Sequence, residues 1–181
     1  MDKEKQKNMI SRREVLKCSV AAGLTLAAGG AFDEALATLG EGASTDRPEA
    51  ARAHFLRSMN CSQAILETYA PACGMKAEQA RKLATGFAGG MGMGHECGAV
   101  TAAYMVLGLA RGPKEGEVFP KLEAFNREFK AHYRELGCSQ LLGVDMGTKE
   151  GVQEADRKGL FKTQCPTYVK TAAEILEKLL S

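Results

Sequence analysis

The sequence predicts a single, compact all-α domain behind an N-terminal signal helix. Apolar residues recur every three to four positions along most of the chain, and no segment alternates as a half-buried strand does. Aromatic residues make up only 6% of the 181 residues, whereas β-sandwiches favour aromatic and β-branched side chains. The formal net charge of +2 gives no electrostatic argument for nucleic-acid binding, so we expect no nucleic-acid partner.

Residues 1–37 have the organisation of an export signal. A basic segment precedes an uncharged run, and Ala35-Leu36-Ala37 offers a small-residue cleavage site. Residues 11–17 (SRREVLK) resemble the twin-arginine export signal, which implies transient contact with that export machinery and a periplasmic or other extracytoplasmic location. We therefore expect residues 38–181 to be the mature domain. The uncharged run is shorter than the ~20 residues of a spanning helix, so a membrane-tethered form is expected only if the signal is not cleaved.

Caps and helix breakers mark the predicted helices of the mature domain. Asp46 and Asn60 are N-cap residues for the first two helices, and Gly112-Pro113 and Gly137 interrupt the chain further on. The polar stretch that ends at Gly159 carries no predicted helix. The predicted helices cover residues 47–59, 61–69, 77–87, 97–110, 118–136, 138–143 and 165–180. In the helix over residues 77–87, one face carries Ala80, Leu83, Ala84 and Phe87. His54 and His132 are expected near the core, on the helices over residues 47–59 and 118–136.

Four of the six cysteines fall at predicted helix N-termini, and these four are called the site cysteines below. Free N–H groups and the helix dipole favour a thiolate over a thiol there, and thiolates are what metals and redox chemistry use. Cys73 stands at a predicted helix end and Cys18 lies in the export signal, so these two are set apart. The site cysteines are Cys61, Cys97, Cys138 and Cys165.

The spacing of the site cysteines excludes local motifs. They are separated by 36, 41 and 27 positions, so neither a zinc finger nor a ferredoxin motif is present. The chain contains no CxxC, and the absence of CxxCH excludes covalent haem of the usual kind. Two further interpretations remain open, namely small buried side chains and two structural disulfides. We expect the site cysteines to converge in one site, which the fold must assemble from four helix ends.

A glycine-rich loop over residues 88–96 precedes the helix that starts at Cys97. Its glycines allow the backbone to fold tightly beside Cys97 and a bound cofactor, and we expect Gly94 and Gly98 to contact that cofactor. His95 is a candidate ligand or proton donor, although a solvated loop histidine is the more ordinary interpretation. Met91 and Met93 are expected to cover apolar surface rather than to bind copper. Asp145 is a candidate helix cap, or a hydrogen-bond acceptor for a residue that contacts the cofactor.

Four short motifs carry a resemblance to a known family. They are NCSQA around Cys61, GGMGMGHECGAVTA around Cys97, CSQLLGVD from Cys138 and CPTYV from Cys165. Together they resemble the C-GCAxxG-C-C family of redox-active proteins over residues 53–180, with Ala102 where the family usually has Gly. The resemblance implies a redox role for the site cysteines.

The sequence therefore predicts an exported redox protein. We expect the site cysteines to hold an iron–sulfur cluster for electron transfer to a separate redox partner protein, because proteins that use twin-arginine export commonly fold around a cofactor in the cytoplasm. The alternatives are a non-redox Cys₄ zinc or disulfide-stabilised interaction module, and a thiol oxidoreductase. No acid–base constellation is readable, so no enzyme reaction is assigned.

Overall fold

The computed structural model describes residues 46–181, and these form an all-α body without a β-strand. The predicted export signal over residues 1–37, together with Cys18, lies outside the described residues. None of the described helices is both long and apolar enough to cross a bilayer. The α-helices are α3 (Arg47–Ser58), α4 (Cys61–Tyr69), α5 (Ala77–Ala84), α6 (Gly98–Arg111), α7 (Glu115–Tyr133), α8 (Cys138–Leu142), α9 (Lys149–Arg157), α10 (Leu160–Thr163) and α11 (Cys165–Leu180), and the shorter turns are η1 (Ala70–Cys73), η2 (Thr85–Phe87) and η3 (Gly90–Gly94).

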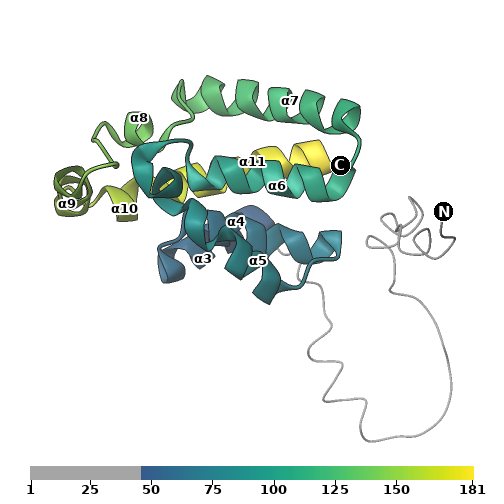
Figure 1. Ribbon diagram of the computed structural model, residues 1–181, viewed down its shortest axis with the longest axis horizontal. Coiled ribbons are helices and arrows are strands. Elements are labelled where there is room, and N and C mark those ends of the chain that lie inside the picture. The colour runs from purple at the N-terminus through teal and green to yellow at the C-terminus, as the bar shows by residue number, and fades with distance from the viewer. Residues whose placement is uncertain (1–45) are drawn as a thin grey trace, which may run out of the picture. The chain divides into compact units, whose positions relative to one another are not determined.

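The helices are arranged around a central pair, α6 and α11 (Figure 1). Helix α7 covers one side of this pair, whereas α3 packs on α11 and α4 packs on α6 from the other side. Helices α8, α9 and α10 gather at the end of the body where α6 and α11 begin (Figure 1). The N-termini of the central helices therefore face the short helices.

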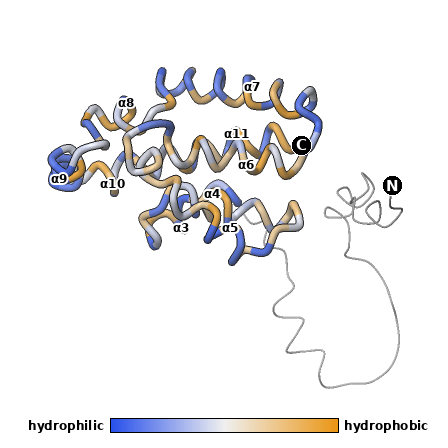
Figure 2. Tube along the Cα trace, in the orientation of Figure 1, coloured by the Kyte–Doolittle hydropathy of each residue, from blue (hydrophilic) through white to orange (hydrophobic). Residues whose placement is uncertain are grey.

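The core is built from small side chains in the centre and aromatic rings under α7. Ala99, Ala102 and Ala103 of α6 are fully buried, which lets neighbouring helices approach closely. Phe125 and Phe129 of α7 are also fully buried and stack with their ring centroids 5.9 Å apart. Figure 2 shows α7 hydrophilic on its outer side and hydrophobic on the side that faces the central pair.

The predicted caps are present in the structure. The Asp46 carboxylate accepts from the Glu49 backbone N–H at 3.2 Å, and the Asn60 side chain accepts from the Gln63 N–H at 2.9 Å. Both interactions satisfy a backbone donor that the helix itself leaves open. The starts of α3 and α4 are therefore determined locally.

Several expectations were wrong in detail. The polar stretch before Gly159 contains α9, which the sequence hides because its nine residues bury only Gly151 and Ala155. The long amphipathic helix ends at Tyr133 rather than at Gly137, because Arg134 has a left-handed φ of 65°.

The segment 77–87 is α-helical only as far as Ala84, and Leu83 of its expected buried face is half exposed. His132, which was expected near the core, is exposed, and His54 is half-buried with its Nε2 3.9 Å from Glu67.

Candidate functional site

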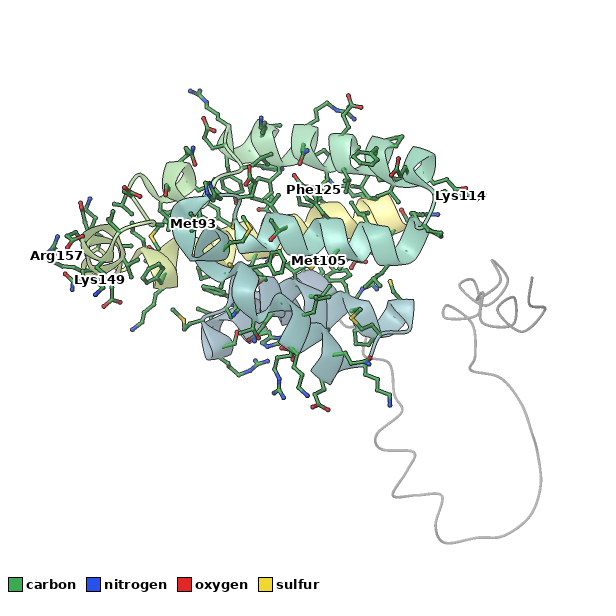
Figure 3. All side chains as sticks on the ribbon, in the orientation of Figure 1. Met93, Met105, Lys114, Phe125, Lys149 and Arg157 are labelled. Atoms are coloured by element: carbon green, nitrogen blue, oxygen red, sulfur yellow. The ribbon has the colours of Figure 1, made fainter. Side chains whose placement is uncertain are left out.

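The four site cysteines line one pocket. The cavity has a volume of about 420 Å³ and lies at the end of the body where α8 and α10 meet the central helices. Figure 3 labels Met93 at this end and Lys114 at the opposite end. The other lining residues are mostly apolar: Phe55, Met59, Ala88, Gly89, Gly92, Leu141, Leu142, Met146, Val152, Phe161 and Tyr168.

Each site cysteine stands at the start of a different helix, as the sequence predicted. Cys61, Cys138 and Cys165 are the first residues of α4, α8 and α11, and Cys97 is the N-cap residue of α6. Three of them are buried, with 8%, 5% and 6% of Cys61, Cys97 and Cys138 exposed, whereas Cys165 is half-buried. Cys73 ends η1 and is not among the lining residues. The four site cysteines are not joined by disulfides and stand as free thiols.

A short backbone ladder places Cys97 beside Cys138. The Cys97 N–H donates to the Leu136 carbonyl at 2.8 Å, and the Cys138 N–H donates to the His95 carbonyl at 2.6 Å. These bonds flank an isolated antiparallel bridge between Glu96 and Gly137. Main-chain hydrogen bonds thus hold the start of α6, at Cys97, next to the start of α8, at Cys138.

Close approach requires a glycine at two positions, Gly94 in the loop and Gly98 at the start of α6. A Cβ on Gly98 would lie 2.6 Å from the Cys61 sulfur and 2.8 Å from the Phe87 carbonyl oxygen. Gly94 has a left-handed φ of 73°, and a Cβ there would collide with the Ser139 hydroxyl. Gly98 therefore touches the sulfur of a site cysteine and Gly94 packs against α8, but neither glycine is among the residues that line the pocket.

The Cys61 thiol differs from the other three. A hydrogen bond from the Cys97 side chain, together with the backbone N–H groups of Gly89, Cys61 and Gly98, lowers the pKa of Cys61 to about 7 against the opposing effect of burial. The same hydrogen bond and burial raise the pKa of Cys97 well above its ordinary value. Cys61 and Cys97 therefore form a contact pair with one acidic member.

The remaining two thiols are harder to ionise. Burial, followed by the negative charge of Cys61, raises the pKa values of both Cys138 and Cys165 to about 12. The expectation that every helix start favours a thiolate is therefore wrong for Cys97, Cys138 and Cys165, because desolvation and neighbouring sulfurs outweigh the dipole. Among the described residues no lysine, arginine or histidine lines the pocket. Four thiolates could coexist there only with a positive group brought in from outside.

Tyr168 is a pocket residue that the sequence analysis missed. It is buried, lies one turn after Cys165 in α11 and donates its hydroxyl hydrogen to the Leu141 carbonyl of α8 at 2.7 Å. Its position three residues after Cys165 was the available signal, because residues three apart share a helix face.

The other singled-out side chains lie elsewhere. His95, Met91 and Met93 are exposed and do not line the pocket, and Met93 is 64% exposed. Asp145 accepts from the Gly147 N–H at 3.0 Å, which closes a local turn.

The sulfurs are not arranged around a point. Over residues 46–181 no group of three or more His, Cys, Asp and Glu side chains is close enough to hold one metal ion. A tetrahedral zinc with Zn–S bonds of about 2.3 Å would need its sulfurs within roughly 4 Å of each other. Four thiols are nevertheless the type of donor set that soft metals prefer.

Fold and pocket together define a helical domain that presents four cysteines, one from each of four helix starts. Residues 59–179 match the model of the family described as "Putative redox-active protein (C_GCAxxG_C_C)", and the chain belongs to this family. The family description supports a redox role. No curated protein and no solved structure matches the chain.

Proposed function

We propose that this protein is an exported electron-transfer protein whose site cysteines hold an iron–sulfur cluster. The observation that carries the proposal is the convergence of four thiols, separated by up to 104 positions in the chain, on one apolar pocket. Such a cluster would take up and release one electron at a time, and the apolar walls would limit the access of water to it. The protein would receive and deliver electrons through a separate redox partner.

The raised pKa values of three site cysteines favour a bound metal cluster over four metal-free thiols. Burial disfavours the ionisation of Cys97, Cys138 and Cys165, so a positively charged metal group would be needed to deprotonate them. Backbone N–H groups of Gly98 and Ala99 already donate toward the sulfurs of Cys61 and Cys97. Hydrogen bonds of this kind tune the potential of a metal–thiolate group.

A group of several metal atoms is compatible with the arrangement of the four site cysteines. A cluster places its metal atoms between the ligands, so it accepts cysteine sulfurs that are further apart than those around one zinc ion. The absence of a single-ion arrangement among the described residues is compatible with that geometry. A Cys₄ zinc site would require α4, α6, α8 and α11 to draw closer together.

The export part of the proposal rests on the sequence. Residues 11–17 resemble a twin-arginine signal, and a cluster built in the cytoplasm would travel inside an already folded protein. The double variant R12K/R13K should therefore remain in the cytoplasmic fraction. Its appearance in the exported fraction at the wild-type level would contradict this route.

The decisive experiment is metal analysis of the full chain purified without oxygen. We expect a brown protein that contains iron and acid-labile sulfide. Cys97→Ser should remove most of both, because a hydroxyl is a poor replacement for a soft thiolate. Cys73→Ser is the matched control and should keep them, because Cys73 is not among the pocket residues. A colourless wild-type protein with stoichiometric zinc, or with two protected disulfides, would instead support the non-redox interaction module.

The contact between Cys61 and Cys97 favours a second candidate, a thiol oxidoreductase. The Cys61 thiolate would attack a disulfide to form a mixed disulfide and release one thiolate. That thiolate would take the proton of Cys97, whose sulfur would then displace the second thiol of the substrate. Two electrons would pass to the substrate, and Cys61 and Cys97 would become a disulfide. A metal-free preparation that reduces a small-molecule disulfide, and loses this activity in both Cys61→Ser and Cys97→Ser, would support this candidate.

A further inference from the structure

Tyr168 is held rigidly at the wall of the pocket. Its ring packs edge-on against Tyr133, with centroids 4.8 Å apart and an interplanar angle of 83°. Tyr133 in turn contacts Phe129 at 5.0 Å, and Phe129 is fully buried. The ring of Tyr168 is therefore supported by the α7 core, and its hydroxyl has a defined direction.

The hydroxyl of Tyr168 joins two helices that each begin with a site cysteine. Tyr168 is three residues after Cys165 in α11, and its acceptor Leu141 is three residues after Cys138 in α8. The hydrogen bond of 2.7 Å thus crosses from α11 to α8 one turn beyond both thiols. It is a brace between the two helix starts.

Helix α8 depends on such external bonds. It has only five residues, which is too short for a helix to be stable by itself. On the side of Cys97 it is fastened by the bond from the Cys138 N–H to the His95 carbonyl. Near Cys165, the hydrogen bond from the Tyr168 hydroxyl to the Leu141 carbonyl connects α8 to α11.

We infer that Tyr168 is a positioning residue, which sets the separation of the Cys138 and Cys165 thiols by bracing α8 against α11. The brace acts on the thiols themselves, so the inference holds whichever group the four cysteines bind. Without it, α8 would lose its hydrogen bond to α11 and keep the bond from Cys138 to His95. Cys138 would then move relative to Cys165, whereas the contact between Cys61 and Cys97 would be preserved.

The test compares Tyr168→Phe with Tyr133→Phe in the reduced, metal-free full chain. Each variant loses one phenol hydroxyl, but the Tyr133 hydroxyl bonds Thr171 at 2.8 Å and does not reach α8. Dibromobimane, which bridges neighbouring thiols, is applied briefly, and the cross-linked peptides are mapped by mass spectrometry. The pair Cys61–Cys97 is an internal control within every sample.

We expect Tyr168→Phe to lower the yield of the Cys138–Cys165 cross-link about fivefold, the effect of one net hydrogen bond on a local equilibrium. The Cys61–Cys97 yield should stay unchanged, and Tyr133→Phe should change neither. Amide exchange of residues 138–142 should rise in Tyr168→Phe alone. The inference is overturned if Tyr168→Phe keeps the wild-type cross-link, if both variants lose both cross-links equally, or if Tyr168→Phe fails to fold while Tyr133→Phe folds. Iron content enters none of these readouts, so the cluster proposal stands or fails separately.

Discussion

The substitution Gly98→Ala is the sharpest test of how the loop and the site cysteines fit together. The added Cβ would lie 2.6 Å from the Cys61 sulfur and 2.8 Å from the Phe87 carbonyl oxygen. Because a backbone oxygen cannot rotate out of the way, α6 or the loop must shift. We therefore expect a less stable protein and an altered Cys61.

The magnitude follows from two opposing effects. Overpacking of a tight site lowers the free energy of unfolding by about 1–3 kcal/mol. Because the added Cβ of Gly98→Ala meets main-chain atoms, we take the upper end, about 3 kcal/mol. Alanine is favoured over glycine in a helix by about 1 kcal/mol, which leaves a net loss of about 2 kcal/mol. At about 3–5 °C per kcal/mol for a body of this size, the Tm should fall by about 6–10 °C.

The assay is thermal unfolding followed by circular dichroism, together with the pH dependence of Cys61 alkylation in the metal-free protein. The midpoint of alkylation should lie near the Cys61 pKa of about 7 in the wild type and rise in the variant, because the Gly98 N–H would be displaced from the sulfur. Gly108→Ala is the matched control in the same helix, because a Cβ there meets nothing within 4 Å. It should stabilise the protein by about 0.4–1 kcal/mol. A Gly98→Ala protein with a Tm at or above the wild-type value, and an unchanged alkylation midpoint, would refute the reasoning.

Three further predictions follow from the packing and the titration of the site. The pKa values of Cys138 and Cys165 are raised from 9.0 to about 12, so the unfolded chain loses these protons first as the pH rises. Between about pH 9 and pH 12, urea unfolding of the reduced, metal-free protein should therefore lose the stabilising contribution of these two thiols, at most about 1.4 kcal/mol per pH unit per thiol, and the loss should be smaller in Cys138→Ser and Cys165→Ser. Phe125→Ala should lower the free energy of unfolding, measured with denaturant, by about 3–5 kcal/mol, because the ring is fully buried. The control is Phe119→Ala in the same helix, where the residue is 62% exposed, and it should change that free energy by no more than about 0.5 kcal/mol. Asn60→Ala should cost about 1–2 kcal/mol in the same assay, because it removes the N-cap of α4, and a loss below a few tenths would contradict that role.

Local signals in the sequence were enough for most of the helices. Asp46 and Asn60 cap α3 and α4 through their own side chains, and a cap needs only residues two or three positions away. The breaks at Gly112-Pro113 and near Gly137 likewise depend on local backbone preferences. The sequence analysis missed α9, although Thr148 caps it through its own side chain, because a mostly polar helix that buries only Gly151 and Ala155 shows little apolar periodicity.

For the candidate site too, the sequence predicted the local features but not those that depend on tertiary packing. The sequence placed each site cysteine at a helix start and set Cys73 apart, and the structure agrees. It overestimated the effect of the helix dipole, because a dipole is a local property whereas desolvation depends on what surrounds the sulfur. Tyr168 falls within the helix predicted over residues 165–180, but its hydrogen bond to α8 joins residues that are 27 positions apart.

The sequence by itself determined the helical class, most helix boundaries and the position of four thiols at helix N-termini, because each of these depends on residues within one or two turns. Only the tertiary structure decided that the four thiols share one pocket, that Cys61 is acidic while its neighbours are not, and that Tyr168 braces α8 against α11. Those properties depend on burial and on distances between segments brought together by packing. Spacing along a chain carries little information about either, since a loop closes at an entropic cost that grows only slowly with its length.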